Sequence, residues 1–276
     1  MSTMRSAKAA LSFTAKLLIG LLIVSPVVFG TLMSFMSPGE FVAIPPHLVP
    51  LEPIITNYIN VSHSFPIFRF VFNSFLVCAI VVVGQIITCS FAAYGFSFYN
   101  FKGRGILFLV VLSTMMIPGD VTIIANFLTI MKLRINDTYL GLVLPYMTSA
   151  MGIFLVRQFF LTIPKELHEA AIIDGCRDLR FLLTIVIPIS KPAMASLGIY
   201  TFIGVYNQFF WPLLVTNSDW MRTVQVGIFF LVNAENGLDL GIIMAGFVIT
   251  LMPAIIAFII GQKQLVKGMT AGAIKG

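Results

Sequence analysis

The sequence predicts an all-α integral membrane protein with six transmembrane helices. Of its 276 residues, 58% are hydrophobic and only 10% are charged, whereas soluble domains carry about 25% charged residues. The apolar stretches are continuous rather than alternating, which favours helices over a transmembrane barrel. Six of them approach the roughly 20 residues that a spanning helix needs. They lie near 17–37, 70–98, 105–131, 138–160, 193–216 and 239–262.

The distribution of basic residues predicts the topology. With the N-terminus in the cytoplasm, only Arg69, Lys132, Arg134 and Arg222 fall on the outer side. An excess of Lys and Arg in cytoplasmic loops is the positive-inside pattern. We therefore expect a multi-pass protein with both termini cytoplasmic. The same pattern accounts for the net charge of +6, so we expect no nucleic-acid partner.

The N-terminal part is expected to be a first span followed by an outer loop, over residues 1–69. The first stretch could be an uncleaved helix or a secretory signal. Its apolar part is long for a signal and no A-x-A cleavage pattern follows, so we favour the uncleaved helix. Prolines interrupt residues 38–69 and prevent a continuous helix there. We expect one domain, 1–276, with a core of about 70–262.

The third stretch is interrupted by a carboxylate. Asp120 follows Pro118-Gly119 directly, and a charge at that depth should face protein or water. Asp120 could therefore lie on a translocation path. Alternatively, it caps the helix that resumes at Val121, because Asp is a favoured N-cap residue.

The fifth stretch combines amides with aromatic rings inside the membrane. Buried amides can hydrogen-bond hydroxyl groups, and rings can stack on sugar faces. The alternative is that the amides bond neighbouring helices and serve packing alone. The candidate residues for a substrate path are Tyr206, Asn207, Gln208 and Trp211, together with Asp120.

A charged cytoplasmic loop over 164–188 separates the fourth and fifth stretches. Pro164 suits the first turn of a helix, and Gly175 stands where a helix commonly ends. The segment 164–174 is thus predicted to be a short helix, and a second helical stretch over 178–187 should end at Pro188. The loop could lie on lipid headgroups or dock a soluble partner, which we favour because few apolar residues precede Gly175. One face of the first helix would carry Leu167, Ala170, Ala171 and Asp174.

Nothing in the sequence predicts catalysis. The histidines are scattered, no metal site is expected, and no GxxxxGK[ST] phosphate loop is present. We expect no cofactor on this chain, and any energy must come from another chain.

The cytoplasmic loop carries a motif with defined spacing. Glu169-Ala170-Ala171 is followed after three residues by Gly175 and, nine residues further, by a run that ends in Pro188. This resembles the EAA signature of the permeases of bacterial ATP-binding-cassette (ABC) uptake systems, with Ile187 where that pattern usually has Leu. Further segments resemble the carbohydrate branch and its maltose-type second permeases: Asn73-Ser74, Ala92-Ala93-Tyr94, 101–104, 116–118, 136–141, 206–208, 211–214 and 264–276. Tyr206 replaces the more usual Trp, and residues 1–70 match only in layout.

The resemblance implies a type I ABC importer permease fold in a bacterial inner membrane. It implies a heterodimeric pore with a second homologous permease, a solute-binding protein outside the cytoplasm, and a carbohydrate substrate. ATP and Mg²⁺ would bind an ATPase dimer at the cytoplasmic face. The alternatives are glycerol-phosphate-type solutes or an ion-coupled secondary carrier, which the near-isolation of Asp120 disfavours. The residues expected to couple to the ATPase are Glu169, Ala170, Ala171, Asp174, Gly175 and Pro188.

Overall fold

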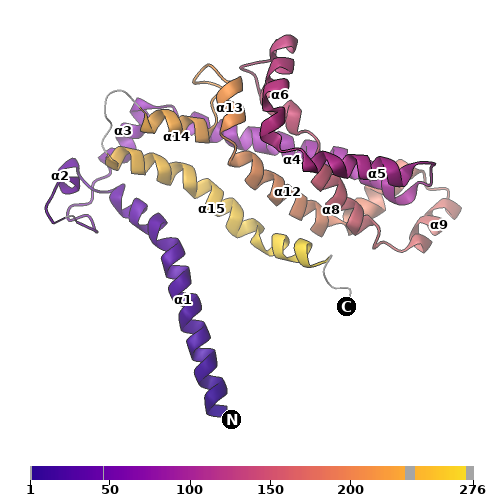
Figure 1. Ribbon diagram of the computed structural model, residues 1–276, viewed down its shortest axis with the longest axis horizontal. Coiled ribbons are helices and arrows are strands. Elements are labelled where there is room, and N and C mark those ends of the chain that lie inside the picture. The colour runs from indigo at the N-terminus through magenta and orange to yellow at the C-terminus, as the bar shows by residue number, and fades with distance from the viewer. Residues whose placement is uncertain (1, 46, 234–239, 272–276) are drawn as a thin grey trace. The chain divides into compact units, whose positions relative to one another are not determined.

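The computed structural model describes residues 2–45, 47–233 and 240–271, and all regular secondary structure in these ranges is helical. The chain divides into two compact units. One comprises the residues up to Ile67 together with Ile228–Met252, and the other comprises Phe68–Gly227 and the residues from Pro253 onward. Figure 1 gives the element labels.

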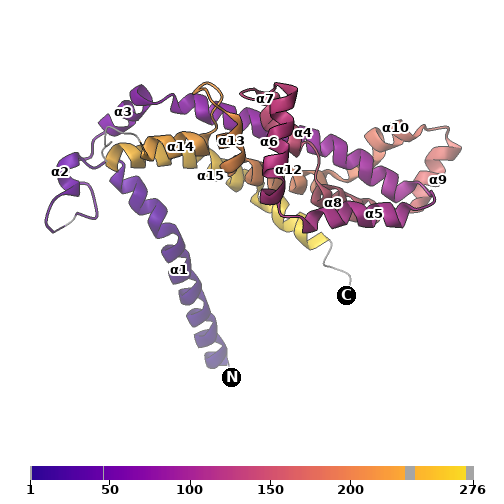
Figure 2. The same cartoon turned by 45° about the horizontal axis from the view of Figure 1, so that its top comes forward.

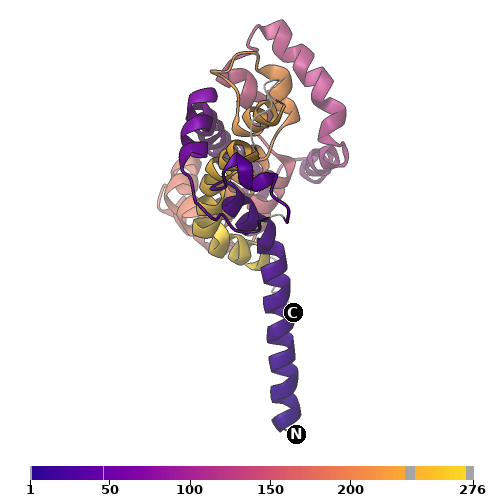
Figure 3. The same cartoon turned by 90° about the vertical axis from the view of Figure 1, so that its left-hand side faces the viewer.

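The first unit contains the N-terminal helix and the outer loop. Its core is formed by Val61, Ile67, Leu231, Ile242 and Ala245. Helix α1 is long and straight (Figure 3), and none of its apolar window from Leu11 to Met33 is buried by the chain. The elements are α1 (Ser2–Met33), α2 (Pro38–Phe41), α3 (Thr56–Ser64), most of α14 (Val224–Val232) and the first part of α15 (Leu240–Ala271).

The second unit holds one straight span and three bent ones. Helix α4 (Ile67–Phe98) runs unbroken for 32 residues. The bent pairs turn by 96°, 51° and 79°. They are α5 (Arg104–Ser113) with η1 (Thr114–Met116) and α6 (Gly119–Leu133); α7 (Tyr139–Val143) with η2 (Leu144–Tyr146) and α8 (Ala150–Phe160); and α10 (Asp178–Phe181), η3 (Leu182–Val186) and α11 (Ile187–Ile189) with α12 (Lys191–Tyr206). Helices α9 (Lys165–Ile173) and α13 (Phe210–Val215) complete it.

The described residues include three helices long and apolar enough to cross a membrane, or up to six if each bent pair is one span. Five of the six expected stretches therefore match in position, although two of these are bent. The fifth, expected over 193–216, overlaps only the second half of the bent pair that runs from Asp178 to Tyr206. Each bend has a local cause. Pro118 is extended and precedes α6, Ser149 caps α8 by accepting the N–H of Gly152, and Pro192 lies in the first turn of α12.

The predicted end of the second loop helix at Pro188 is wrong. The helical run continues through Pro188 to Ile189 and passes through a π-helix over 182–186. Proline lacks the N–H that an α-helix would donate to the carbonyl four residues earlier. The wider i→i+5 pattern of η3 accommodates this loss without ending the helix.

The main core of the second unit joins α4, α8 and α12. Helix α8 contacts both α5 and α12, and Figure 2 shows α5 and α8 side by side. Gly152 makes the closest approach possible, because a Cβ there would lie 2.8 Å from Cys89 Sγ and 3.0 Å from Leu197. Small residues commonly allow such close packing of membrane helices.

Candidate functional site

Helix α9 forms as the sequence predicts and is capped at Gly175. Pro164 is its N-cap and Lys165 its first residue. At the other end, the N–H of Cys176 donates to the Ala171 carbonyl at 2.8 Å, and the N–H of Gly175 donates to Ile172 at 3.0 Å. Gly175 has a φ of +71°. This is a Schellman C-cap, which favours glycine because the left-handed conformation costs it little.

The exposed face of α9 differs from the predicted one. Ala171 turns inward and packs in the core with Phe181, whereas Leu167, Ala170 and Asp174 are exposed. The free surface also includes Ile173, which is 85% exposed. The packing of Ala171 against this core therefore fixes the position of α9. Glu169, Ala170, Asp174 and Gly175 remain open to solvent, while Pro188 is exposed on α11.

A group of aromatic side chains holds α9 against the end of α4. The His168 ring lies 5.3 Å from the ring of Phe98 and 4.9 Å from that of Phe181. On the neighbouring helix, Asp178 accepts hydrogen bonds from the hydroxyl groups of Tyr94 and Tyr99. The bond to the Asp178 carboxylate raises the pKa of Tyr99. The sequence analysis did not select His168, although its place directly before Glu169 made it visible.

In the membrane, three of the five candidate path residues gather around Tyr146. The Trp211 ring lies 6.2 Å from the Tyr146 ring, and its indole N–H donates to the Leu142 carbonyl at 3.2 Å. The Gln208 side chain lies beside the Tyr146 hydroxyl, and Asp120 is close enough to act on that hydroxyl electrostatically. The bends therefore bring α6, η2 and α13 to one polar region.

The remaining two candidates lie elsewhere. Tyr206 is buried with Cys78, and its ring packs 5.8 Å from Phe75 and 5.5 Å from Phe202. Asn207 is the C-cap residue of α12 and is exposed. Tyr206 is thus placed among packing contacts, whereas Asn207 is free to meet a solute.

The capping role considered for Asp120 is wrong. Pro118 is the N-cap of α6, and Asp120 lies in the first helical turn with its side chain exposed. The reason is that Pro118 takes the extended conformation and the helix starts at Gly119, two residues too early for Asp120 to cap it.

Tyr146, at the bend between η2 and α8, is the centre of this region and was not among the residues predicted from the sequence. Its backbone carbonyl accepts a hydrogen bond from the Gln85 side-chain amide at 2.9 Å, and the Oε1 atom of the same amide accepts one from the Thr201 hydroxyl at 2.7 Å. Gln85 is therefore a helix-to-helix contact. Pro145 directly before Tyr146 was the available signal, because proline inside a span marks a break.

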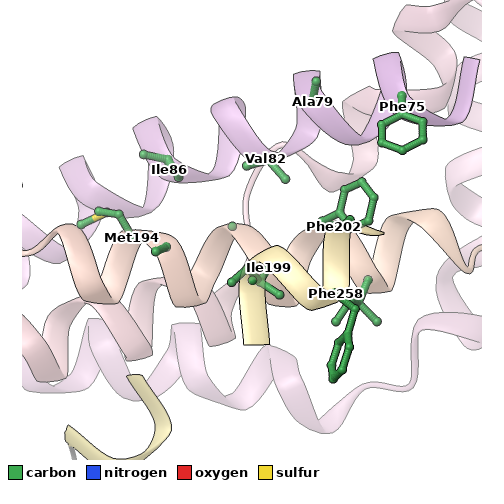
Figure 4. Close-up of a pocket in the computed structure, with 13 residues that line it drawn as sticks. Phe75, Ala79, Val82, Ile86, Met194, Ile199, Phe202 and Phe258 are labelled. Atoms are coloured by element: carbon green, nitrogen blue, oxygen red, sulfur yellow. The ribbon is translucent and has the colours of Figure 1, made fainter. Parts of the chain in front are cut away.

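A separate apolar groove of about 600 Å³ runs along α4, α12 and α15 (Figure 4). Its walls include Phe75, Val82, Ile199, Phe202 and Phe258. Every lining residue is apolar or glycine. A carbohydrate needs convergent polar groups, so this groove is not the polar site. Among the described residues, no group of three or more His, Cys, Asp or Glu side chains could hold a metal ion.

The bent apolar helices and the two polar regions define a multi-pass membrane protein of the permease type, with α9 exposed between two of its spans. The comparisons with known proteins specify it further, because the family of binding-protein-dependent transport system inner membrane components matches residues 85–271. The chain belongs to this family and is an ABC importer permease.

Several known proteins resemble the chain over most of its length. A putative ABC transporter permease, ORF2 of Caldicellulosiruptor sp. (strain Rt8B.4), is 36% identical over 91% of each chain. The sn-glycerol-3-phosphate transport system permease protein UgpE of Brucella abortus (strain 2308) is 35% identical over 92% of this chain and 93% of its own. A solved bacterial ABC transporter involved in import of the acidic polysaccharide alginate has a TM-score of 0.82 at 23% identity, covering 94% of this chain and 97% of its own.

Proposed function

We propose that this chain is half of a heterodimeric pore that imports a neutral carbohydrate. In this proposal a second homologous permease forms the other half, and a solute-binding protein delivers the sugar from outside the cytoplasm. An ATPase dimer, which binds ATP and Mg²⁺, docks at the cytoplasmic face. The observation that carries the proposal is the exposed end of α9, which presents Glu169, Ala170 and Asp174 on a helix fixed at Gly175.

The geometry of α9 suits docking better than contact with lipid. Its free surface alternates carboxylates with small and apolar residues, and Ala170 allows a partner surface to approach closely. A helix that lies on headgroups usually presents basic residues and a broad apolar face. Glu166 and Glu169 would instead be repelled by anionic lipid.

The region around Tyr146 supports a carbohydrate as the solute. Gln208 offers an amide donor and acceptor and Tyr146 offers a ring with a hydroxyl group, which is a combination that binds polyols, while the buried Trp211 ring packs against Tyr146. Asn207 adds an exposed amide at the end of α12. Asp120 is the charged side chain in this region, and residues 105–131 and 193–216 contain no Lys or Arg. A neutral solute fits this charge better than an anion, because a carboxylate repels a phosphate.

The second candidate function is transport of glycerol-phosphate-type solutes. The similarity to the glycerol-3-phosphate permease of Brucella abortus favours it. The charge around Asp120 opposes it, since this chain brings no cation to the polar region to balance a phosphate.

Reconstitution in proteoliposomes tests the proposal. The tagged chain is purified with its bound subunits, and ATP-dependent uptake of radiolabelled maltose is compared with that of glycerol 3-phosphate. We expect uptake of the neutral sugar, or of other neutral oligosaccharides in a panel, and none of the phosphate. Preferred uptake of glycerol 3-phosphate would select the second candidate. Accumulation by this chain alone, driven by a proton or sodium gradient without ATP, would overturn both.

A further inference from the structure

The cytoplasmic end of α4 is the place where both the docking helix and the returning helix rest. Phe98 contacts His168 of α9 at 5.3 Å and Phe181 of α10 at 5.6 Å between ring centroids. Tyr94 stacks on Phe98 at 4.9 Å and donates to Asp178 at 3.3 Å. Figure 2 shows α9 and this end of α4 together. A displacement of α9 therefore acts directly on the end of α4 and on α10.

One contact in this group is incomplete. His168 Nε2 is a buried atom without a hydrogen-bond partner, and it lies 3.8 Å from Asp178 Oδ1. That separation is too long for a hydrogen bond. A buried polar atom without a partner is destabilising, so a state in which Nε2 bonds Asp178 would recover this loss.

The same Asp178 oxygen is already in use. Oδ1 accepts the Tyr94 hydroxyl in a long bond of 3.3 Å, while Oδ2 accepts Tyr99. If His168 approaches Oδ1, Tyr94 must share or yield this acceptor. Tyr94 belongs to α4, so this exchange of hydrogen-bond partners at Asp178 would change the contacts that hold α4.

Helix α4 connects this end to the polar region in the membrane. Gln85 lies nine residues before Tyr94, which is about 14 Å along the helix axis. Gln85 donates to the Tyr146 carbonyl, and Thr88 donates to the Met147 carbonyl at 2.7 Å. Because α4 has no break, a shift at Tyr94 reaches the bend between η2 and α8 directly.

We propose that His168 is a positioning residue: on ATPase docking, its Nε2 closes onto Asp178, and α4 carries the resulting shift to the break at Tyr146. This inference rests on the docking function of α9 proposed above. Glu169 and Ala170 of the motif are exposed and Ala171 is buried, whereas the ring of His168 packs between Phe98 and Phe181.

A thiol reporter at the end of α12, next to Gln208, tests the inference in the purified complex in nanodiscs. Asn207→Cys supplies an exposed thiol, in a Cys176→Ser background because Cys78 and Cys89 are buried. The rate of maleimide labelling is measured with and without ATP and vanadate, and the ATP-dependent change is divided by the ATP hydrolysed. His168→Phe keeps the ring packing and removes the nitrogen. His63→Ala, an exposed histidine on α3, is the matched control.

We expect His168→Phe to lower this ratio about fivefold or more, which is a typical allosteric coupling, and His63→Ala to leave it unchanged. A ratio like that of the parent in His168→Phe overturns the inference. If His168→Phe fails to assemble, Asp178→Asn, which keeps the shape and weakens the acceptor, decides in the same way. If the parent itself recovers no ATPase, the docking function fails, and this result is distinct from a failure of the His168 contact.

Discussion

The loop around α9 and the membrane break around Tyr146 both place polar groups beside aromatic rings, but the polar groups are exposed in the loop and largely buried in the break. In the loop, Glu169 and Asp174 are exposed and the aromatic rings lie beneath the helix. In the break, the indole of Trp211 and the amide of Gln85 are buried and hydrogen-bonded to backbone carbonyls. The loop therefore leaves its polar groups accessible to a partner, whereas the break uses its polar groups to join helices.

Within the break, the residues that join helices also differ from the residues that are accessible to a solute. Gln85 accepts a hydrogen bond from Thr201 and donates one to the Tyr146 carbonyl, so these two side chains join neighbouring helices. Gln208, Asn207 and Asp120 are more accessible, and they are the residues left to meet a solute. A variant of the first group should alter stability, and a variant of the second should alter uptake.

Replacement of Trp211 should cause the largest loss of stability and tests whether this ring stabilises the break around Tyr146. Trp211 is 2% exposed, and replacing such a buried ring by alanine costs about 3–5 kcal/mol. We expect Trp211→Ala to lower the unfolding temperature in detergent strongly, as measured by size-exclusion chromatography after heating. Trp220→Ala is the control because Trp220 is 69% exposed. Equal stability of the two variants would show that Trp211 does not support the break.

Substitution of Gly175 should disrupt the loop around α9 and leave the structure around Tyr146 unchanged. A β-branched residue with positive φ is strained by about 1–3 kcal/mol, so Gly175→Val should unwind the C-cap of α9 and reduce ATP-driven uptake about tenfold. Gly103→Val is matched, because Gly103 also has a positive φ, of +83°, with nothing within 4 Å of an added Cβ. If both variants lose uptake equally, backbone strain alone explains the loss and the docking role of α9 is not supported.

The hydrogen bond between Thr201 and Gln85 offers a smaller and more precise test. Interhelical bonds in membranes contribute about 0.6 kcal/mol on average and up to about 1.7. A double-mutant cycle with Thr201→Val and Gln85→Leu should give a coupling energy in this range for the free energy of unfolding. Strict additivity of the two changes would indicate that the bond contributes nothing to the stability of the break.

The smallest effect is expected where Asp137, before α7, meets the loop after α13, through a carboxylate that lies outside the spans. Burial acts to raise the pKa of Asp137, but the N–H groups of Asn217 and Ser218 donate to its carboxylate and hold that pKa below its ordinary value of 3.8. A lowered folded pKa stabilises the loop above the unfolded value and loses that stabilisation as pH falls through the folded value. Acrylamide quenching of Trp220 in a Trp211→Phe background should therefore increase at acid pH below about 4.

The control for this pH dependence is Asp137→Asn, which cannot titrate. Its quenching should be independent of pH across the same range. A pH dependence equal to that of the parent would assign the effect to another group.

Much of the fold could be predicted because periodicity, charge and proline act locally. The six stretches, the end of α9 at Gly175 and the interruption at Asp120 all depend on residues close in sequence. The bend angles and the π-helix before Pro188 could not be predicted, since they depend on how neighbouring helices pack. For the same reason the sequence did not show that Ala171 faces inward or that Tyr146, rather than Tyr206, joins Trp211.

Site-directed cross-linking at Ala170 tests the central claim most directly. Ala170→Cys in a Cys176→Ser background is treated with a short bifunctional reagent in native membranes, and Asn217→Cys on the outer loop is the control. The account predicts that Ala170→Cys is joined to an ATP-binding subunit and that Asn217→Cys is not. An ATP-binding subunit that purifies with this chain but is never joined to Ala170→Cys would contradict docking through α9.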